Sequence, residues 1–373
     1  MSFLVSPPLH ATRYEVPRSL PDAADGLTEL ERRILHALAE EVPTAPPGRC
    51  QTTRILERVL ETAPSLEEHL GKEDWRDTNS PHVAAYAAVI DLAVAYRTRY
   101  PLIDYAGNFG SRDGRPADHF YNECRLSRWG QAVLERSVPN LLVNGARAAP
   151  HGALHFVPRN LRKVTDVLVA VIAGSSAREV VANASSELAP DFPTGGVLAG
   201  VTPSVVQEGR GTVRLRAWVR VEPIRSPYAK DADPTPCVLV SNLPEDVDRR
   251  RFTEQACSLV MSRQLGGATD AWELPDGDSI AFPTAPGARI ERVEAAVRAQ
   301  LPLEAEITVD GLAVVAGRTH RLGLLELVEH AAASQIARER DRMPAADDIT
   351  LRNAAIAHLR AVAEEHGDDP RSS

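Results

Sequence analysis

The glycine-rich stretch at residues 99–126, RYPLIDYAGNFGSRDGRPADHFYNECRL, constrains the fold of this chain more than any other segment. Its first residues are apolar and predict a short buried segment. Residues that interrupt regular elements then follow, at Gly107, Gly110, Gly114 and Pro116. The middle of the stretch is therefore predicted to be a shaped loop with positive φ angles, and the spacing of Leu126, Trp129 and Val133 predicts a helix after it.

A tyrosine, Tyr121, stands at the exit of this loop and has basic residues around it. The flanking arginines are Arg112, Arg115, Arg125 and Arg128. Backbone N–H groups of a glycine-rich turn and guanidinium groups both bind phosphate oxygens. A phenol beside such groups indicates a nucleophile that acts on a nucleic acid, although a single tyrosine between a loop and a helix is more commonly structural.

The composition is that of an ordinary globular chain. Its 373 residues are 43% hydrophobic and 25% charged, which is enough for two or three domains. The formal net charge of −9 argues against a protein that coats nucleic acid indiscriminately. Residues 115–163 are nevertheless net positive and leave room for a local basic surface. The chain has no signal peptide and no apolar run that could span a membrane, so we expect a cytoplasmic, nucleoid-associated protein.

The cysteines are far apart in the sequence and form no CxxC pair. They are Cys50, Cys124, Cys237 and Cys257. This spacing predicts neither a zinc site nor a disulfide framework. Cys124 lies three residues after Tyr121, and we interpret it as a small buried helix residue rather than as a thiol nucleophile.

The loop and its tyrosine resemble a known family. The run YPLIDYAGNFGSRDGRPA, with Tyr121 four residues before an Arg-Leu pair, is similar to the breakage-reunion domain of bacterial type IIA topoisomerase A subunits, gyrase A and its topoisomerase IV counterpart. Further blocks follow the family's order: RSLPDAADGLTELERRIL at 18–35, VPNLLVNG at 138–145, PDFPTGG at 190–196 and EGRGTVRLRAWVRVE at 208–222. By this resemblance, Tyr121 attacks a DNA phosphate and carries a 5′-phosphotyrosyl link.

The resemblance implies an α+β fold with two main domains. A winged-helix (CAP-like) DNA-gate domain at 18–138 is followed by a mixed α/β tower domain at 139–325. An N-terminal arm at 1–17 precedes them, and a short helical segment at 326–373 is the remnant of the family's coiled-coil arm. The apolar spacing predicts helices near 27–38, 55–60, 82–95, 166–173, 322–336 and 349–363, a buried strand-like run at 138–145, and strands at 212–221, 237–241 and 304–309.

Several residues take roles in DNA binding by this resemblance. Arg32 and Arg33 stand where the family has its own arginine pair, whereas Thr28 and Glu31 replace the family's Lys and His. The residues expected to contact DNA are Arg32, Arg33, His82, Arg99, Arg115, Arg125, Arg147 and Ala149. Of these, Ala149 lies near the position of the isoleucine that wedges between base pairs in the family, and an alanine predicts weaker bending of DNA.

The catalytic set also departs from the family. Phe120 occupies the position of the arginine that precedes the family's tyrosine. Either another arginine, Arg112, Arg115 or Arg33, supplies positive charge beside Tyr121, or the activity is poor. No metal ligands are expected on this chain. In the family, a B-type partner with an ATPase and an acidic TOPRIM domain brings Mg²⁺ in trans, and ATP acts only through that partner. Val83 and Ala87 stand at the quinolone-contact positions and predict insensitivity to quinolones.

Three functions remain open at the level of sequence. The first is a compact A component of a type IIA topoisomerase, an isomerase that forms a homodimeric DNA gate within an A2B2 assembly. The second is a weak or inactive gyrase A homologue that binds DNA or gyrase subunits and modulates or protects gyrase. The third is a structural dimer with a vestigial gate. The retained tyrosine and loop favour the first function.

Overall fold

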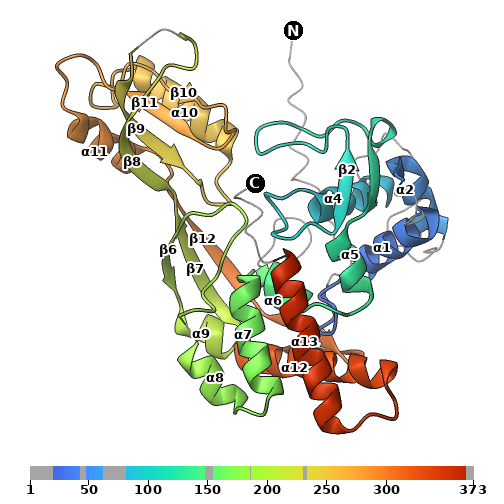
Figure 1. The fold of residues 1–373 in the computed structure, drawn as a ribbon. Helices are drawn as coiled ribbons and strands as arrows, with labels where there is room; N and C mark the ends of the chain where they lie inside the picture. Colours follow the sequence, from blue (N-terminus) through green and yellow to red (C-terminus); the bar gives the residue numbers. More distant parts are fainter. Residues whose placement is uncertain are drawn as a thin grey trace.

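The computed structural model describes residues 20–42, 48–61, 81–147, 154–184, 186–229 and 233–366. Within these ranges helices and strands are mixed, which confirms the predicted α+β class (Figure 1). The predicted N-terminal arm lies outside the described residues. The predicted domain boundaries stay predictions. No helix in the described ranges is long and apolar enough to cross a membrane.

Three helices and a small sheet form the part of the molecule that we call the first lobe, drawn in blue to teal in Figure 1. The sheet is antiparallel, with strand order β1-β3-β2, and the helices pack on it and on one another. The elements are α1 (Glu29–Glu41), β1 (Cys50–Gln51), α2 (Thr52–Glu61), α4 (Pro81–Ala93), β2 (Ile103–Ala106) and β3 (Glu123–Leu126). All three predicted helices are present, because each presents an apolar face that is buried, such as Ile55, Leu56 and Val59 of α2.

The segment after the glycine-rich loop differs from the prediction. Leu126 does not belong to a helix but ends β3, where it pairs with Ile103. Cys124 likewise lies in this strand rather than in a helix. Because β3 is the central strand and pairs with both neighbours, its backbone hydrogen bonds decide the conformation. The helix begins only at α5 (Arg128–Leu134), after Ser127 accepts a hydrogen bond from the backbone of Gly130.

The strand-like prediction for 138–145 is wrong, because this run contains a short helix, α6 (Asn140–Asn144). Its asparagines explain the difference. Asn144 donates to the side chain of Asn140 one turn earlier, at 2.8 Å, and also exchanges two hydrogen bonds with the backbone of Tyr100. Helical geometry brings these two amides together, whereas side chains four residues apart in a strand would be too distant.

A five-stranded sheet forms the middle of the molecule, with strand order β4-β5-β12-β7-β6. Its strands are β4 (Ala146–Arg147), β5 (Leu154–Phe156), β6 (Val197–Val201), β7 (Arg210–Arg216) and β12 (Glu304–Asp310). The neighbouring helices are α7 (Leu161–Ile172), α8 (Ala177–Asn183) and α9 (Pro203–Gln207). The predicted strand at 304–309 and the predicted buried helix at 166–173 are confirmed as β12 and as part of α7.

The predicted strand at 212–221 is two strands in two sheets. β7 ends at Arg216, and β8 (Trp218–Ile224) enters a four-stranded sheet of order β10-β11-β9-β8. The other elements there are β9 (Thr235–Ser241), α10 (Arg249–Met261), β10 (Trp272–Glu273), β11 (Ile280–Pro283) and α11 (Ile290–Gln300). This unit, at the upper left of Figure 1, is the distal lobe, and it has its own apolar core. Its strand β9 confirms the prediction at 237–241.

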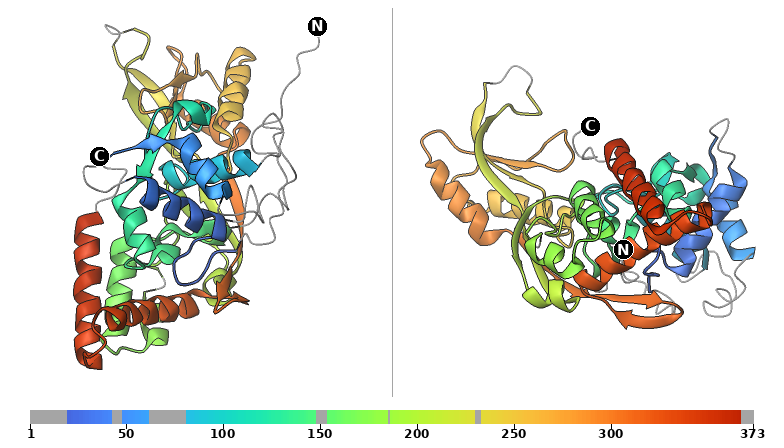
Figure 2. Two further views of the ribbon diagram at one scale, coloured as in Figure 1. Left: turned by 90° about the vertical axis from the view of Figure 1, so that its right-hand side faces the viewer. Right: turned by 60° about the horizontal axis from the view of Figure 1, so that its bottom comes forward.

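Two long helices end the described chain. A hairpin of β13 (Leu312–Val315) and β14 (Arg318–Arg321) leads into α12 (Leu324–Arg342) and α13 (Asp348–His366). Both helices pack against α7 and against each other, as the two views in Figure 2 show. The two predicted C-terminal helices are therefore present. Their apolar residues join those of the first lobe in one continuous core.

Candidate active site

Tyr121 lies at the surface of the first lobe, where its side chain is free to meet a ligand. It ends a single turn of 3-10 helix, η2 (His119–Tyr121), and it is 79% exposed. The turn is fixed by Asp118, whose carboxylate accepts from the backbone N–H of Phe120 and whose carbonyl accepts from that of Tyr121 at 3.0 Å. The backbone is thus held while the phenol stays outside.

A buried amide supports this turn from below. Asn122, the next residue, is fully buried and donates from Nδ2 to Tyr86 Oη at 2.5 Å and to the carbonyl of Asn108 at 3.0 Å. Its Oδ1 accepts from the backbone N–H of Asn108 at 2.9 Å. Tyr86, on α4, donates in turn to the carbonyl of Ala117 at 2.8 Å. Asn122 therefore holds the start of the glycine-rich loop at Asn108, and Tyr86 of α4 holds its end at Ala117.

The glycine at the start of the loop is required by this arrangement. Gly107 has a φ of +107°, and a Cβ at that position would lie 2.2 Å from Asn122 Oδ1. A side chain there would both strain the backbone and displace the buried amide. The prediction of a shaped loop with positive φ angles is therefore confirmed.

Aromatic rings continue from the buried amide to the surface. His119 lies between Tyr86 and Phe120, with ring centroids 5.6 Å and 4.2 Å away. Burial lowers the pKa of His119, although the neighbouring carboxylate of Asp118, 2.9 Å from Nδ1, acts in the opposite direction. Phe120, which precedes Tyr121 in the chain, is 57% exposed, and its ring contacts that of His119.

Arg112, predicted to act in catalysis, is engaged elsewhere in this structure. Its guanidinium lies 2.9 Å from the carboxylate of Asp278 and donates to the carbonyls of Leu243 and Pro244, all in the distal lobe. Its neighbour Asp113 is ion-paired with Arg249, at the start of α10. We call these two reciprocal ion pairs the clasp. They join the glycine-rich loop to the distal lobe, and they occupy Arg112.

The two arginines of α1 also have carboxylate partners. Arg32 makes two hydrogen bonds of 2.9 Å to Asp25, and Arg33 lies 2.7 Å from Glu29. The residues that replace the family's Lys and His have a structural role here. Thr28 and Glu31 form a capping box, in which each side chain satisfies the other's backbone N–H at the start of α1.

The remaining predicted DNA contacts fall into different environments. Arg99 is 2% exposed and is ion-paired with Asp191 at 2.8 Å, so its guanidinium faces the interior and does not match the predicted contact with DNA. Arg125 pairs with Asp104 across β2 and β3. Arg115, in the loop, is exposed and forms no ion pair with any residue that the structure describes. His82 is partly buried near the start of α4.

Two predicted positions lie at the edge of the described residues or beyond it. Arg147 ends β4, and its side chain is not among those that the structure describes, whereas Ala149 lies outside the described residues. In the described ranges, no three His, Cys, Asp or Glu side chains lie close enough together to hold a metal ion.

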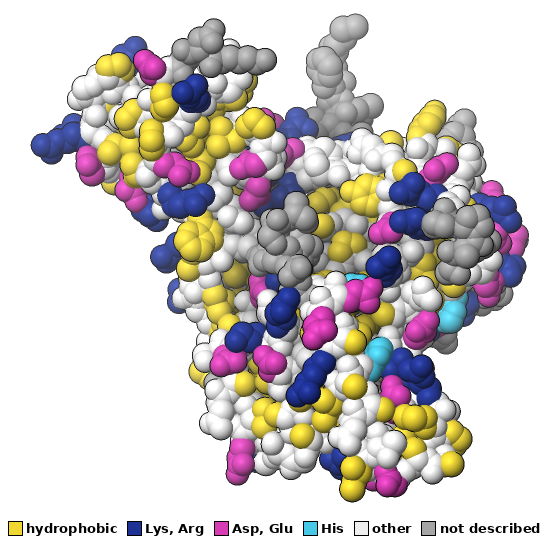
Figure 3. All heavy atoms as spheres, in the orientation of Figure 1, with side chains coloured by type: hydrophobic (Ala, Val, Ile, Leu, Met, Phe, Trp, Pro, Cys, Tyr) yellow, Lys and Arg dark blue, Asp and Glu magenta, His cyan; other side chains and the backbone are white. Residues whose placement is uncertain are grey.

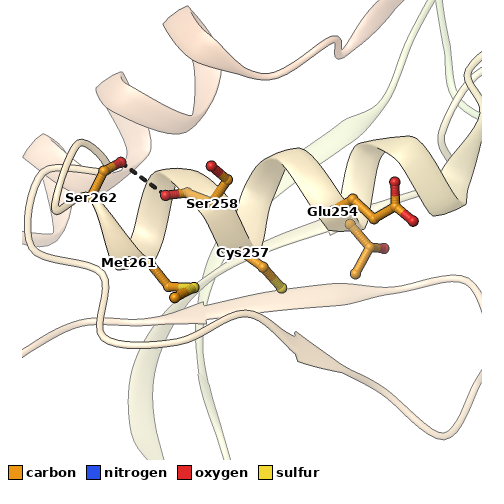
Figure 4. A pocket seen from close by; sticks show the side chains of 6 residues that line it. Glu254, Cys257, Ser258, Met261 and Ser262 are labelled. Atoms are coloured by element: carbon orange, nitrogen blue, oxygen red, sulfur yellow. Dashed lines mark hydrogen bonds between the residues drawn. The ribbon is translucent and has the colours of Figure 1, made fainter. Parts of the chain in front are cut away.

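The surface charge is mixed on the face seen in Figure 3, where basic and acidic side chains are interspersed. A shallow hollow lies along α10, and all its lining residues come from that helix and the turn after it (Figure 4). They are Thr253, Glu254, Cys257, Ser258, Met261 and Ser262. One helix face does not enclose a ligand, so this hollow is not a candidate site. Tyr121 and its supports remain the best-defined chemical feature.

Sequence reasoning missed the residues that hold the site. Neither Asn122 and Tyr86 nor the clasp partners Asp278 and Arg249 stand out from the motif alone. One signal is present: Tyr86 is the one tyrosine in an alanine-rich helical run. The clasp has no local signal, since Arg112 and Asp278 are 166 residues apart.

Comparison with known proteins supports the resemblance found in the sequence. The family model for the A subunits of DNA gyrase and topoisomerase IV matches residues 132–344, which begins shortly after Tyr121 and extends through α12. The DNA gyrase A protein of Staphylococcus epidermidis is 28% identical over 348 residues, 84% of this chain and 36% of that protein. That of Granulibacter bethesdensis is 30% identical over 296 residues, 71% of this chain and 29% of that protein.

A third relative gives the same result. The DNA gyrase A protein of Halalkalibacterium halodurans is 28% identical over 355 residues, which is 86% of this chain and 39% of that protein. This chain thus spans somewhat more than a third of the length of that relative and less than a third of the one from Granulibacter bethesdensis.

Proposed function

This chain belongs to the DNA gyrase/topoisomerase IV A-subunit family, and on that premise we propose that it is an A-subunit-like component of a type IIA topoisomerase. In this proposal, residues 18–138 form the winged-helix DNA gate, residues 139–325 form the tower domain, and residues 326–373 are the remnant of the coiled-coil arm. The observation that carries the proposal is the presentation of Tyr121, an exposed phenol at the end of a turn that Asp118 caps and that the buried, hydrogen-bonded side chain of Asn122 follows.

The proposed reaction is a transesterification. The phenol oxygen of Tyr121 attacks a DNA phosphorus while its proton passes to solvent, and the bond from phosphorus to the 3′ oxygen breaks. The products are a 5′-phosphotyrosyl link and a free 3′ hydroxyl, and the reverse attack reseals the strand. A free phenol has a pKa of about 10, so the reaction needs positive charge near the phosphate. Asn122 and Asp118 contribute by holding the backbone that carries the nucleophile.

In this conformation, the positive charge that the scissile phosphate needs must come from a residue other than Phe120, Arg112 or Arg33. Phe120 carries none, Arg112 lies in the clasp, and Arg33 is paired with Glu29. Arg115 shares the glycine-rich loop with Arg112 and is exposed. We therefore expect Arg115 to contact the DNA phosphate while the ion pairs of the clasp are intact. Arg112 and Arg33 can contact the phosphate only after their carboxylate partners release them.

The proposal includes partners that this chain does not contain. Duplex DNA is the substrate, a second copy forms the homodimeric gate, and a B-type subunit completes an A2B2 assembly. That partner supplies Mg²⁺ and the ATPase. When bound, Mg²⁺ adds positive charge near the scissile phosphate. We assign no metal ligand and no ATP contact to this chain.

A second candidate function rests on the same residues. Phe120 stands in place of an arginine, and the clasp holds Arg112 away from solvent. Loss of one such charge commonly lowers a rate by about two to three orders of magnitude. A homologue that binds DNA or gyrase subunits without cleaving would show these features, and it would modulate or protect gyrase.

A cleavage assay separates the two functions. The full chain is mixed with a B-type subunit, Mg²⁺, ATP and supercoiled plasmid, and the reaction is stopped with detergent and protease. We expect protein-linked nicked or linear DNA, and we expect none with Tyr121→Phe. Tyr228→Phe is the matched control, since Tyr228 is also exposed but lies in the distal lobe. Absence of a covalent complex, with DNA or gyrase binding intact, contradicts the proposal and supports the second function.

The arginines are then compared in the same assay. We expect Arg115→Ala to reduce the amount of covalent complex by about 100-fold or more. Arg220→Ala is the matched control, because Arg220 is exposed on β8. If Arg115→Ala cleaves as well as this control, the assignment of Arg115 is wrong and the arginines of the clasp or of α1 become the alternatives.

A further inference from the structure

Two cysteines that are distant in the sequence meet across the small sheet of the first lobe. Cys50 is the first residue of β1, and its partner in the antiparallel register is Cys124 of β3. Directly opposite residues in such a ladder have Cα atoms about 4.5 to 5.5 Å apart. A disulfide requires a Cα separation of roughly 4.4 to 6.8 Å. The sheet therefore brings these thiols within reach of one another without movement of the backbone.

The two thiols have different access to solvent. Cys124 is fully buried, and its sulfur accepts a hydrogen bond from Thr52 Oγ1 at 3.7 Å. Cys50 is only partly buried, at the edge strand. A small oxidant can thus reach Cys50 and not Cys124. Contact with the Cys124 thiol lowers the pKa of Cys50, and the charge of Arg54 acts in the same direction.

We propose that Cys50 and Cys124 are a redox pair that closes to a cross-strand disulfide when a peroxide oxidises Cys50. The Cys50 thiolate attacks one oxygen of hydrogen peroxide, so that a sulfenic acid forms and hydroxide leaves. The Cys124 thiol then attacks the sulfenic sulfur, and a disulfide and water are formed. The pair loses two electrons to the peroxide, and a dithiol reductant reverses the reaction.

The disulfide joins segments that matter to the candidate active site. Cys124 is three residues after Tyr121, and Thr52, next to β1, donates its backbone N–H to the carbonyl of Asn122 at 2.9 Å. Oxidation would add a covalent bond between β1, which leads into α2, and β3, the strand that follows Tyr121. The proposal itself concerns only the thiols, so it stands or falls independently of whether Tyr121 cleaves DNA.

Peptide mapping of the full chain tests the pair. The Cys257→Ser variant removes the exposed thiol and is the working background. The reduced protein is treated with hydrogen peroxide under native conditions, alkylated, and digested with trypsin. We expect the peptide 50–54 linked to the peptide 113–125. The linked species should weigh two hydrogen atoms less than the two separate peptides, and dithiothreitol should convert it back to those peptides. Cys237 is the internal control, because it is buried on β9 opposite Glu222 and Pro283.

Two variants test the order of the reaction. With Cys124→Ser, the sulfenic acid at Cys50 has no partner and should be trapped by dimedone. With Cys50→Ser, Cys124 should stay unmodified because the oxidant does not reach it. The proposal is overturned if the native protein gives no linked peptide, or if Cys50 is overoxidised while Cys124 stays a free thiol. Linkage of Cys237 in place of Cys50 would contradict it equally.

Discussion

The first lobe and the distal lobe are both helices packed on one antiparallel sheet, but they are held together in different ways. In the distal lobe, β8 and β9 pair over seven residues and enclose a core that belongs to that lobe alone. In the first lobe the strands are two to four residues long, and the core continues into α7, α12 and α13. Buried side-chain hydrogen bonds fix the loop that carries Tyr121.

This difference explains why the exposed candidate nucleophile lies in the first lobe and not in the distal lobe. A long ladder determines the position of every residue in it and leaves little freedom for an exposed reactive group. Short strands leave the connecting loops to be positioned by individual side chains, such as Asn122. The clasp then links the two lobes, so that the rigid one limits the movement of the loop in the other.

The largest expected contrast comes from the same substitution in each lobe. Phe252→Ala removes a ring that is 1% exposed in the distal core, and it should lower the free energy of unfolding of that lobe by about 3 to 5 kcal/mol. Phe120→Ala removes an exposed ring and should change the stability of the first lobe by less than about 0.5 kcal/mol. Urea titration read by hydrogen exchange and mass spectrometry resolves the two lobes.

Two outcomes would contradict the expected difference between Phe252→Ala and Phe120→Ala. Equal losses in both lobes would mean that Phe120 is packed in solution and that the first lobe buries its aromatic surface against a partner. Destabilisation of the first lobe by Phe252→Ala would mean that the lobes unfold together through the clasp.

The sequence predicted the elements whose pattern is local. Helices α1, α2, α4, α12 and α13 each have an apolar face at helical spacing, and the glycines marked the loop before Tyr121. It failed where distant pairing decides the conformation. β3 is a strand because it lies between β1 and β2, and 212–221 is divided because Ala217 lies where the chain passes from one sheet to the other.

The candidate site shows the same limit. Tyr121 could be identified from its motif, whereas the ion-pair partners of the arginines could not. The contact of Arg112 with Asp278 and that of Arg99 with Asp191 both join residues far apart in the sequence. A sequence motif identifies an arginine, but only the folded structure shows which carboxylate is ion-paired with it.

A moderate and local effect is expected for Asn122→Ala. The substitution leaves Tyr86 Oη and the backbone groups of Asn108 without their partner, which should cost about 1 to 3 kcal/mol. Amide exchange should accelerate in residues 107–118 and stay unchanged in the distal lobe. Tyr86→Phe is the graded control, because it removes the hydroxyl and keeps the ring. Uniform acceleration in both lobes would show that the network supports the whole molecule rather than the loop.

The smallest expected effect is a difference in pH dependence between the lobes. Burial holds the pKa of His119 in the first lobe below its ordinary value of 6.5. As the pH falls through 6.5, the unfolded chain takes up a proton that the folded chain resists, so the first lobe loses stability there. In the distal lobe, burial opposes ionisation of Asp276, but hydrogen bonds from Ser279 and Asp278 outweigh it and lower the pKa below 3.8.

The distal lobe should therefore keep the contribution of Asp276 at neutral pH and lose it only as the pH falls below about 3.8. Hydrogen exchange in urea, repeated from pH 7 to pH 5 with correction for intrinsic exchange, should show a decline in the first lobe alone. His119→Gln should reduce that decline because it removes one titrating ring, and the remaining decline is assigned to His358 and His366 of α13, whose pKa burial also lowers. An unchanged slope in this variant would assign the decline to another group, and a parallel decline in both lobes would mean that the clasp couples their stabilities.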